Sequence, residues 1–226
     1  MCFSAPASFI ASGGLALLGG TSLAIAKKED RLLAAIPFLF AIQQAFEGVQ
    51  WLYLNAGSSS LFAGYVFLFF AFVVWPVYMP TLVYFLDTKK QKILKWFLIL
   101  GVLVAFYYIG LLLTQSLVID KLKSCVSYTF NYPIIGMNFV MVAYLVAVFG
   151  PMIVSSRKIL KWFGIVSALL AFISWIFYSV NFTSVWCFFA AIVSSMFFIY
   201  IKWKNKSIKA ANTIADELLR KPKTKG

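Results

Sequence analysis

A single acidic residue lies deep in an apolar stretch of the sequence, AIQQAFEGVQWLYL at positions 41–54. The residues on both sides of Glu47 are typical of a membrane-spanning segment. A charge at bilayer depth costs about 2.5–3.5 kcal/mol on insertion scales, so such a side chain is usually paired, protonated or placed beside a cavity. The chemistry that Glu47 could support is therefore the binding of a proton, a cation or a polar ligand.

Helical spacing places other polar side chains on the same face as Glu47. Gln43, Glu47 and Trp51 recur at i, i+4 and i+8, with Gln44 adjacent. Gly48 allows a neighbouring helix or a ligand to approach closely. Two interpretations stay open: a face that lines a pocket or pathway, and a protonated carboxyl that only cross-links helices.

Depth in the membrane adds further candidates near the same outer boundary. Asn138, Tyr178 and Trp186 lie at a depth similar to that of Glu47 in their own segments. We therefore predict an outward-opening polar cavity with six ligand-binding residues: Gln43, Glu47, Trp51, Asn138, Tyr178 and Trp186.

Catalytic and cofactor motifs are scarce. The chain has no histidine and three cysteines, which excludes histidine-based triads and histidine-ligated zinc or haem. Neither a CxxC pair nor a phosphate-binding glycine-rich motif ending in GK[ST] occurs. We predict no metal and no cofactor, and the pattern disfavours an enzyme without excluding one.

These residues must be positioned by membrane helices. Of the 226 residues, 62% are hydrophobic and only 12% are charged, about half the charged fraction of a soluble domain. The sequence predicts an all-α polytopic membrane protein, because backbone groups in lipid must be paired within each segment. We expect seven transmembrane helices near 5–26, 32–54, 61–86, 96–118, 133–154, 162–180 and 185–201.

The basic residues predict the orientation. Of 20 Lys and Arg residues, 18 fall in connections or the tail on one side, and only Lys121 and Lys123 fall on the other. The positive-inside rule then places the N-terminus outside and the C-terminus in the cytoplasm, in the inner membrane of a bacterium. We expect the first segment to stay as a helix, because MCFSAPASF lacks the positive region of a signal peptide.

The last 25 residues differ from the rest. We predict a transmembrane domain at 1–201 and a basic cytoplasmic tail at 202–226. An apolar stripe in SIKAANTIADELLRK favours a short amphipathic helix on the inner leaflet, and the lysines favour anionic lipid. A solvated tail is the other interpretation. The partners expected are membrane lipids rather than nucleic acid, and the sequence does not define an oligomeric state.

Prolines and cysteines add two structural expectations. Pro76 and Pro80 in WPVYMP each remove a backbone donor, which predicts a kink that could serve as a hinge. All three cysteines map to the outer side, where a disulfide can persist. Cys2 with Cys187 would join the N-terminus to the last helix, Cys125 is an alternative partner for either, and three free thiols remain an alternative.

Four short motifs, MCFSAPASF, IQQAFEGVQW, VWPVYMP and SVWCFFAAIVSS, together resemble an uncharacterised family of small bacterial seven-helix membrane proteins. Such proteins open Met-Cys-Phe/Trp-Ser, carry a His-Gln-x-x-Glu-type motif in the second helix, and carry Trp-Cys-x-x-Ala-Ala in the last. Ile42 stands where that resemblance implies a histidine. The resemblance gives weight to Cys2, Gln43, Glu47, Trp51, Trp186 and Cys187, but it implies no reaction.

Three functions remain open at this point. The first is binding or transport of a small ligand, cation or lipid headgroup in the cavity around Glu47. The second is an outer-face thiol/disulfide or lipid-modifying enzyme that uses Cys2 and Cys187. The third is a structural or regulatory membrane protein without a small ligand.

Overall fold

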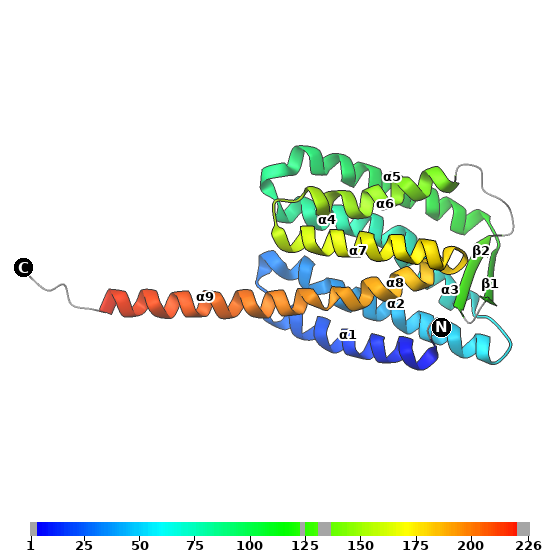
Figure 1. Ribbon diagram of the computed structural model, residues 1–226, viewed down its shortest axis with the longest axis horizontal. Coiled ribbons are helices and arrows are strands. Elements are labelled where there is room, and N and C mark those ends of the chain that lie inside the picture. The colour runs from blue at the N-terminus through cyan, green and yellow to red at the C-terminus, as the bar shows by residue number, and fades with distance from the viewer. Residues whose placement is uncertain (1–3, 123–124, 131–136, 221–226) are drawn as a thin grey trace, which may run out of the picture.

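The computed structural model describes residues 4–122, 125–130 and 137–220, without the side chains of 137, 138 and 214–220. The chain forms a bundle of helices that lie side by side, as Figure 1 shows. A two-stranded hairpin closes one end of the bundle, and a long C-terminal helix leaves the other end.

The helices of the described chain run along the bundle (Figure 1). Their bounds are α1 (Ala5–Ile25), α2 (Arg31–Asn55), α3 (Leu61–Phe69), α4 (Trp75–Leu86), α5 (Gln91–Thr114), α6 (Met137–Val154), α7 (Lys158–Phe177), α8 (Phe182–Ser194) and α9 (Met196–Arg220). Helix α3 continues into α4, and α8 into α9, in the same direction. Short helical turns precede α2, α5 and α8 at Lys28–Asp30, Thr88–Lys90 and Ser179–Asn181.

Six helical segments of the described chain are long and apolar enough to cross a membrane. They are Ala5–Ile25, Lys28–Asn55, Leu61–Leu86, Thr88–Thr114, Lys158–Phe177 and Ser179–Thr213. The apolar part of α6, Phe139–Val154, is shorter. The mostly helical membrane protein expected from the sequence is therefore confirmed, while the count of seven spans and the orientation stay predictions.

The distribution of polarity also fits a lipid environment. Large apolar side chains cover the outside of the bundle, such as Ile10, Phe106 and Leu113, whose exposed fractions are 75%, 67% and 81%. Uncharged polar and acidic side chains of α2 are fully buried inside it. An apolar belt of this size on a soluble monomer would be unusual, but in a bilayer it is the surface in contact with lipid.

Helices α1 and α2 pack closely because small residues line their contact. A side chain at Gly19 would meet the backbone nitrogen of Phe38 at 2.5 Å. Farther along, the Ser12 hydroxyl donates to the carbonyl of Ala41 at 2.8 Å. Gly48 meets the ring of Phe9, which would lie 2.9 Å from an added Cβ. The close approach expected at Gly48 is therefore made by a side chain of α1.

The span 61–86 is irregular at its centre, just before the first of its two prolines. A π-helical turn at Phe70–Val74 joins α3 to α4, and the Trp75 nitrogen donates to Phe70 rather than to Ala71. Pro76 has no N–H, so it cannot donate to the Ala71 carbonyl either. The hydroxyl of Tyr144, on α6, donates to that carbonyl at 2.8 Å.

The kink predicted from Pro76 and Pro80 therefore corresponds to a π-helical turn that comes just before Pro76. Pro80 likewise leaves the carbonyl of Pro76 without its usual helical donor. Helix α5 lies directly against this carbonyl at Gly101, where an added Cβ would be only 1.9 Å from the Pro76 oxygen. The prolines are therefore packed tightly against α5, and their role as a hinge stays a prediction.

The connection between α5 and α6 contains strands that the all-helical prediction did not include. Strands β1 (Leu117–Leu122) and β2 (Cys125–Phe130) pair antiparallel, with Leu117 opposite Phe130 and Leu122 opposite Cys125. Alternation in CVSYTF puts Cys125 and Ser127 on one face and buries Val126 on the other side of the ribbon. The hairpin covers one end of the bundle, as seen in Figure 1.

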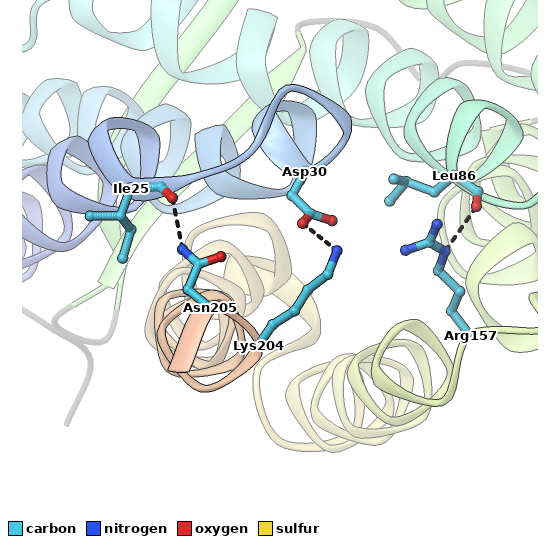
Figure 2. Close-up of polar contacts among 6 residues, drawn as sticks. All are labelled: Ile25, Asp30, Leu86, Arg157, Lys204 and Asn205. Atoms are coloured by element: carbon cyan, nitrogen blue, oxygen red, sulfur yellow. Dashed lines mark hydrogen bonds and ion pairs between the residues drawn. The ribbon is translucent and has the colours of Figure 1, made fainter. Parts of the chain in front are cut away.

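The tail also differs from its expected form. Residues 202–220 continue the helix that begins at Met196, so no separate short helix starts after position 201. Helix α9 is tied to the bundle where it leaves it. Lys204 pairs with Asp30 at 2.5 Å, and the Asn205 amide donates to the Ile25 carbonyl at 2.8 Å, both drawn in Figure 2.

Candidate functional site

The core-facing side of α2 carries a continuous row of polar side chains, which we call the α2 polar stripe. It consists of Gln43, Gln44, Glu47, Gln50 and Trp51. The first four are 0% exposed and Trp51 is 3% exposed. Their spacing of i, i+1, i+4, i+7 and i+8 places them on one helical face. In a membrane bundle, buried polar residues of this kind are expensive and usually functional.

Glu47 points into the bundle, as expected from the cost of exposing it to lipid. The Ser184 hydroxyl donates a short hydrogen bond to Glu47 Oε1, and the Gln44 amide donates to Oε2 at 3.2 Å. Ser184 lies in the first turn of α8, which packs against α2. Both described partners are neutral, so neither compensates the charge of an ionised carboxylate.

Gln43 joins the α2 polar stripe to the irregular span. The indole nitrogen of Trp75 donates to Gln43 Oε1 at 2.8 Å, and the Gln43 amide lies 3.5 Å from the carbonyl of Phe67. The Trp75 ring stacks on Phe40 with a centroid distance of 4.0 Å. Trp75, the residue that follows the π-helical turn, thus hydrogen-bonds directly to the stripe.

Several buried polar atoms of the stripe have no hydrogen-bond partner among the residues that the structure describes. They are Gln44 Oε1, both amide atoms of Gln50 and the indole nitrogen of Trp51. A buried polar group left unpaired costs about 1–3 kcal/mol. These atoms are on the same helical face as Glu47. The described residues leave their hydrogen bonds unmade, so they are free to bind a ligand.

The hairpin contributes another such atom and covers the stripe. The Tyr128 hydroxyl is buried without a partner in the described part of the chain, and the Tyr128 ring stacks on Phe67 with a centroid distance of 5.0 Å. Tyr128 lies close enough to Glu47 for the two to interact electrostatically. Asn181, just before α8, holds the hairpin by donating to the Val126 carbonyl at 3.1 Å.

A basic residue of the hairpin lies at the edge of the stripe. The Lys121 ammonium is 5.5 Å from the centre of the Trp51 ring and 3.2 Å from the side-chain oxygen of Asn55. A cation over an indole face is attracted by the ring. Lys121 therefore connects β1 to the end of α2. Its hydrogen bond to Asn55 is exposed, so the two elements can separate here without breaking a buried hydrogen bond.

Cys187 is a free and buried thiol, which corrects the predicted Cys2–Cys187 disulfide. It lies one turn into α8 and faces Gln43 in the bundle interior. Cys125, the alternative partner, is disulfide-bonded. Cys2 lies outside the described residues. A thiol enclosed in this way is poorly placed for exchange chemistry at the outer surface.

Trp186 and Cys187 line a small cavity of about 20 Å³, together with Trp75, Tyr144 and Ser167. A space of this size is enough for about one water molecule. Glu47 does not border this cavity. The outward-opening cavity around Glu47 stays a prediction: the carboxyl is fully buried, and neither this cavity nor the space beside α9 borders it.

The remaining predicted residues are placed differently. Tyr178 is half-buried at the end of α7, where its backbone nitrogen bonds to Ser174. The side chain of Asn138 lies outside the described part of the chain. The structure therefore brings together Gln43, Glu47 and Trp51 in one stripe, with Trp186 on the adjacent cavity.

Sequence reasoning missed four members of the site: Gln50, Trp75, Tyr128 and Ser184. Gln50 stands three residues after Glu47, so helical spacing alone could have identified it. Ser184, Trp75 and Tyr128 come from other elements, and only their packing brings them to α2.

The chain belongs to a family of unknown function, DUF6629, whose model matches residues 1–213. This agrees with the expected uncharacterised family. No curated protein and no solved structure matches the chain.

Proposed function

We propose that this membrane protein binds a small cation, the smallest being a proton, at the α2 polar stripe, as the loading step of transport across the membrane. The observation that carries the proposal is Glu47, which is 0% exposed and whose described hydrogen-bond partners, Ser184 and Gln44, are both uncharged. An ionised carboxylate in such a place needs a positive counter-charge.

The unpaired atoms define the chemistry of the site further. Gln44 Oε1 and Gln50 Oε1 are acceptors, and the Tyr128 hydroxyl can accept as well as donate. Together with the carboxylate they form an oxygen-rich set, which suits a proton, an alkali cation or a small ammonium ion. A lipid headgroup fits less well, because Glu47 is closely packed and fully buried.

The hairpin is the element that would have to open for a cation to enter. It covers the end of the bundle where α2 finishes (Figure 1), and its Tyr128 interacts electrostatically with Glu47. Binding and release would need the hairpin to move away from Phe67 and Trp51, the two residues against which its aromatic and basic side chains rest.

The test is the ligand dependence of thermal stability in purified full-length protein. A ligand that binds only the folded state raises stability in proportion to RT ln(1 + [L]/Kd). Melting temperatures would be measured against pH, and in sodium, potassium, methylammonium or bulky choline salts at constant ionic strength. We expect the wild type to respond to pH or to at least one small cation over choline.

Two variants separate a charge role from a structural role. Glu47→Gln keeps the shape and removes the charge. Its amide oxygen can still accept from Gln44, and its NH2 group can donate to the Ser184 oxygen instead of accepting from it, so the variant should fold and lose the response. Ser184→Ala removes one hydrogen bond but keeps the charge, so it should be less stable and retain the response. If Glu47→Gln responds as the wild type does, Glu47 only cross-links helices and the proposal fails.

A further inference from the structure

We infer that α9 carries a binding site for one anionic phospholipid where it leaves the bundle. The site is a hollow of about 560 Å³ along one face of the helix. It is lined by Phe198, Ile199, Lys202, Trp203, Lys206, Ser207 and Ala210.

The level of this hollow relative to the membrane follows from the contacts that hold α9. Lys204 and Asn205 bind Asp30 and the carbonyl of Ile25, which mark the start of α2 and the end of α1. Figure 2 shows these contacts beside Arg157 and Leu86, at the start of α7 and the end of α4. Four helix ends thus lie near positions 204–205, which sets the boundary between hydrocarbon and headgroups there.

The lining changes character across that boundary. Phe198 and Ile199 lie on the bundle side, and Ile199 is 56% exposed. Trp203 lies at the boundary and is 72% exposed, which suits an indole at headgroup level. Lys202 and Lys206 are exposed one turn apart on the same face. The Lys202 ammonium lies 5.9 Å from the centre of the Phe198 ring. An acyl chain would contact the apolar part, and a phosphate would attract the ammonium groups of both lysines.

The charge balance selects an anionic lipid as the occupant. Of the described acids at this end of the bundle, Asp30 is paired with Lys204, Asp87 is held by the turn that follows α6, and Glu29 is exposed, so the exposed lysines outnumber the exposed acids. The chain carries a net charge of +13, so a second copy would bring a similarly positive surface. Membrane-surface lysines each contribute about 1 kcal/mol of attraction to anionic lipid.

The experiment is native mass spectrometry of the full-length protein with phosphatidylglycerol or phosphatidylcholine titrated into the detergent. We expect one phosphatidylglycerol to be retained in preference to phosphatidylcholine. The double variant Lys202→Gln/Lys206→Gln should lower the affinity for phosphatidylglycerol about 30-fold, because it removes the attraction of two lysines of the strength given above. Both side chains are exposed, so the variant should fold as the wild type does. An unchanged elution volume in size-exclusion chromatography checks this.

The matched control is Lys89→Gln/Lys92→Gln, which removes two exposed lysines at the same end of the bundle, beside and within α5. It should change the affinity by less than about twofold, because these lysines lie outside the hollow. Equal retention of the two lipids by the wild type would overturn the inference, as would equal losses in both double variants. Displacement by millimolar inorganic phosphate would also overturn it, since the site would then recognise a soluble anion.

Discussion

At the residue scale, the clearest dependence between distant parts of the chain is the hydrogen bond from Tyr144 to the Ala71 carbonyl. The π-helical turn and Pro76 together leave this carbonyl without a backbone donor. Tyr144 also hydrogen-bonds Trp186, so one hydroxyl connects α6 with the irregular span and with α8. The irregular backbone is tolerated in the membrane because a side chain of another helix satisfies it.

We predict that Tyr144→Phe lowers the free energy of unfolding by about 1–3 kcal/mol, the cost of leaving a buried acceptor unpaired. The measurement is thermal or denaturant unfolding of the purified protein in detergent. Tyr108→Phe is the control, because the Tyr108 hydroxyl is buried and no described residue hydrogen-bonds to it. Its removal should be neutral or slightly stabilising, and equal losses in the two variants would contradict the assigned role of Tyr144.

At the element scale, α5 can approach α4 only because Gly101 lacks a side chain. An added Cβ would lie 1.9 Å from the Pro76 oxygen and 3.2 Å from Pro80 Cγ. We predict that Gly101→Ala destabilises the fold by about 1–3 kcal/mol, because backbone rather than a flexible side chain must move. The change would appear as a lower melting temperature.

Gly110→Ala provides the comparison within the same helix. Nothing lies within 4 Å of a Cβ added at Gly110. Alanine there should be neutral or stabilise α5 by up to about 1 kcal/mol through its higher helix propensity. A Gly101→Ala variant as stable as Gly110→Ala would show that α4 and α5 do not pack as closely as described.

The turns at the end opposite the hairpin are joined by Asp87. Its carboxylate accepts from the backbone of Ser156, the hydroxyl of Ser155 and the backbone of Lys89. Arg157 in turn donates to the Leu86 carbonyl at 2.8 Å, as drawn in Figure 2. One carboxylate thereby connects the end of α4 with the turn between α6 and α7.

This arrangement predicts a pH dependence. Burial alone would raise the pKa of Asp87, but the hydrogen bonds from Ser156, Ser155 and Lys89 outweigh it and hold the pKa below the ordinary 3.8. The ionised form is thus favoured by folding, so its contribution is complete above pH 3.8 and is lost as the pH falls through the lowered pKa.

We therefore expect Asp87→Asn to lower stability at pH 7 by about 1–3 kcal/mol and to reduce the fall in melting temperature on acidification. Glu29→Gln is the control, since Glu29 is exposed at the same end of the bundle. A wild type and an Asp87→Asn variant that lose stability in parallel below pH 5 would refute this role.

Spacing and burial cost explain which parts of the site could be predicted from the sequence. The row of Gln43, Glu47 and Trp51 follows from helix geometry, and the inward direction of Glu47 follows from the cost of exposing it to lipid. Ser184 is 137 positions away along the chain, and no local pattern distinguishes its hydroxyl from that of another serine. The strands between positions 117 and 130 were not predicted, because strand pairing depends on a partner segment rather than on local composition.

At the scale of the whole molecule, the hairpin and the exit of α9 lie at opposite ends of the bundle. We predict that a reporter active only in the cytoplasm works when fused after Gly226 and fails when inserted at Ser58, in the turn between α2 and α3. The distribution of basic residues predicts this orientation. Activity at Ser58 and none after Gly226 would reverse it, and activity at both would mean that the two ends are not on opposite sides.

The position of Ser184 has a consequence for the biogenesis of the protein. Chains are inserted from the N-terminus, so α2 enters the bilayer long before α8 has been synthesised. Until then Glu47 has only Gln44, on its own helix, as a described hydrogen-bond partner. Helix α1, which packs on α2 through Gly19 and Gly48, is the neighbour present from the beginning. A chain truncated before α8 would hold Glu47 in the membrane without the Ser184 hydroxyl, so the pairing of this carboxyl is completed only when α8 arrives.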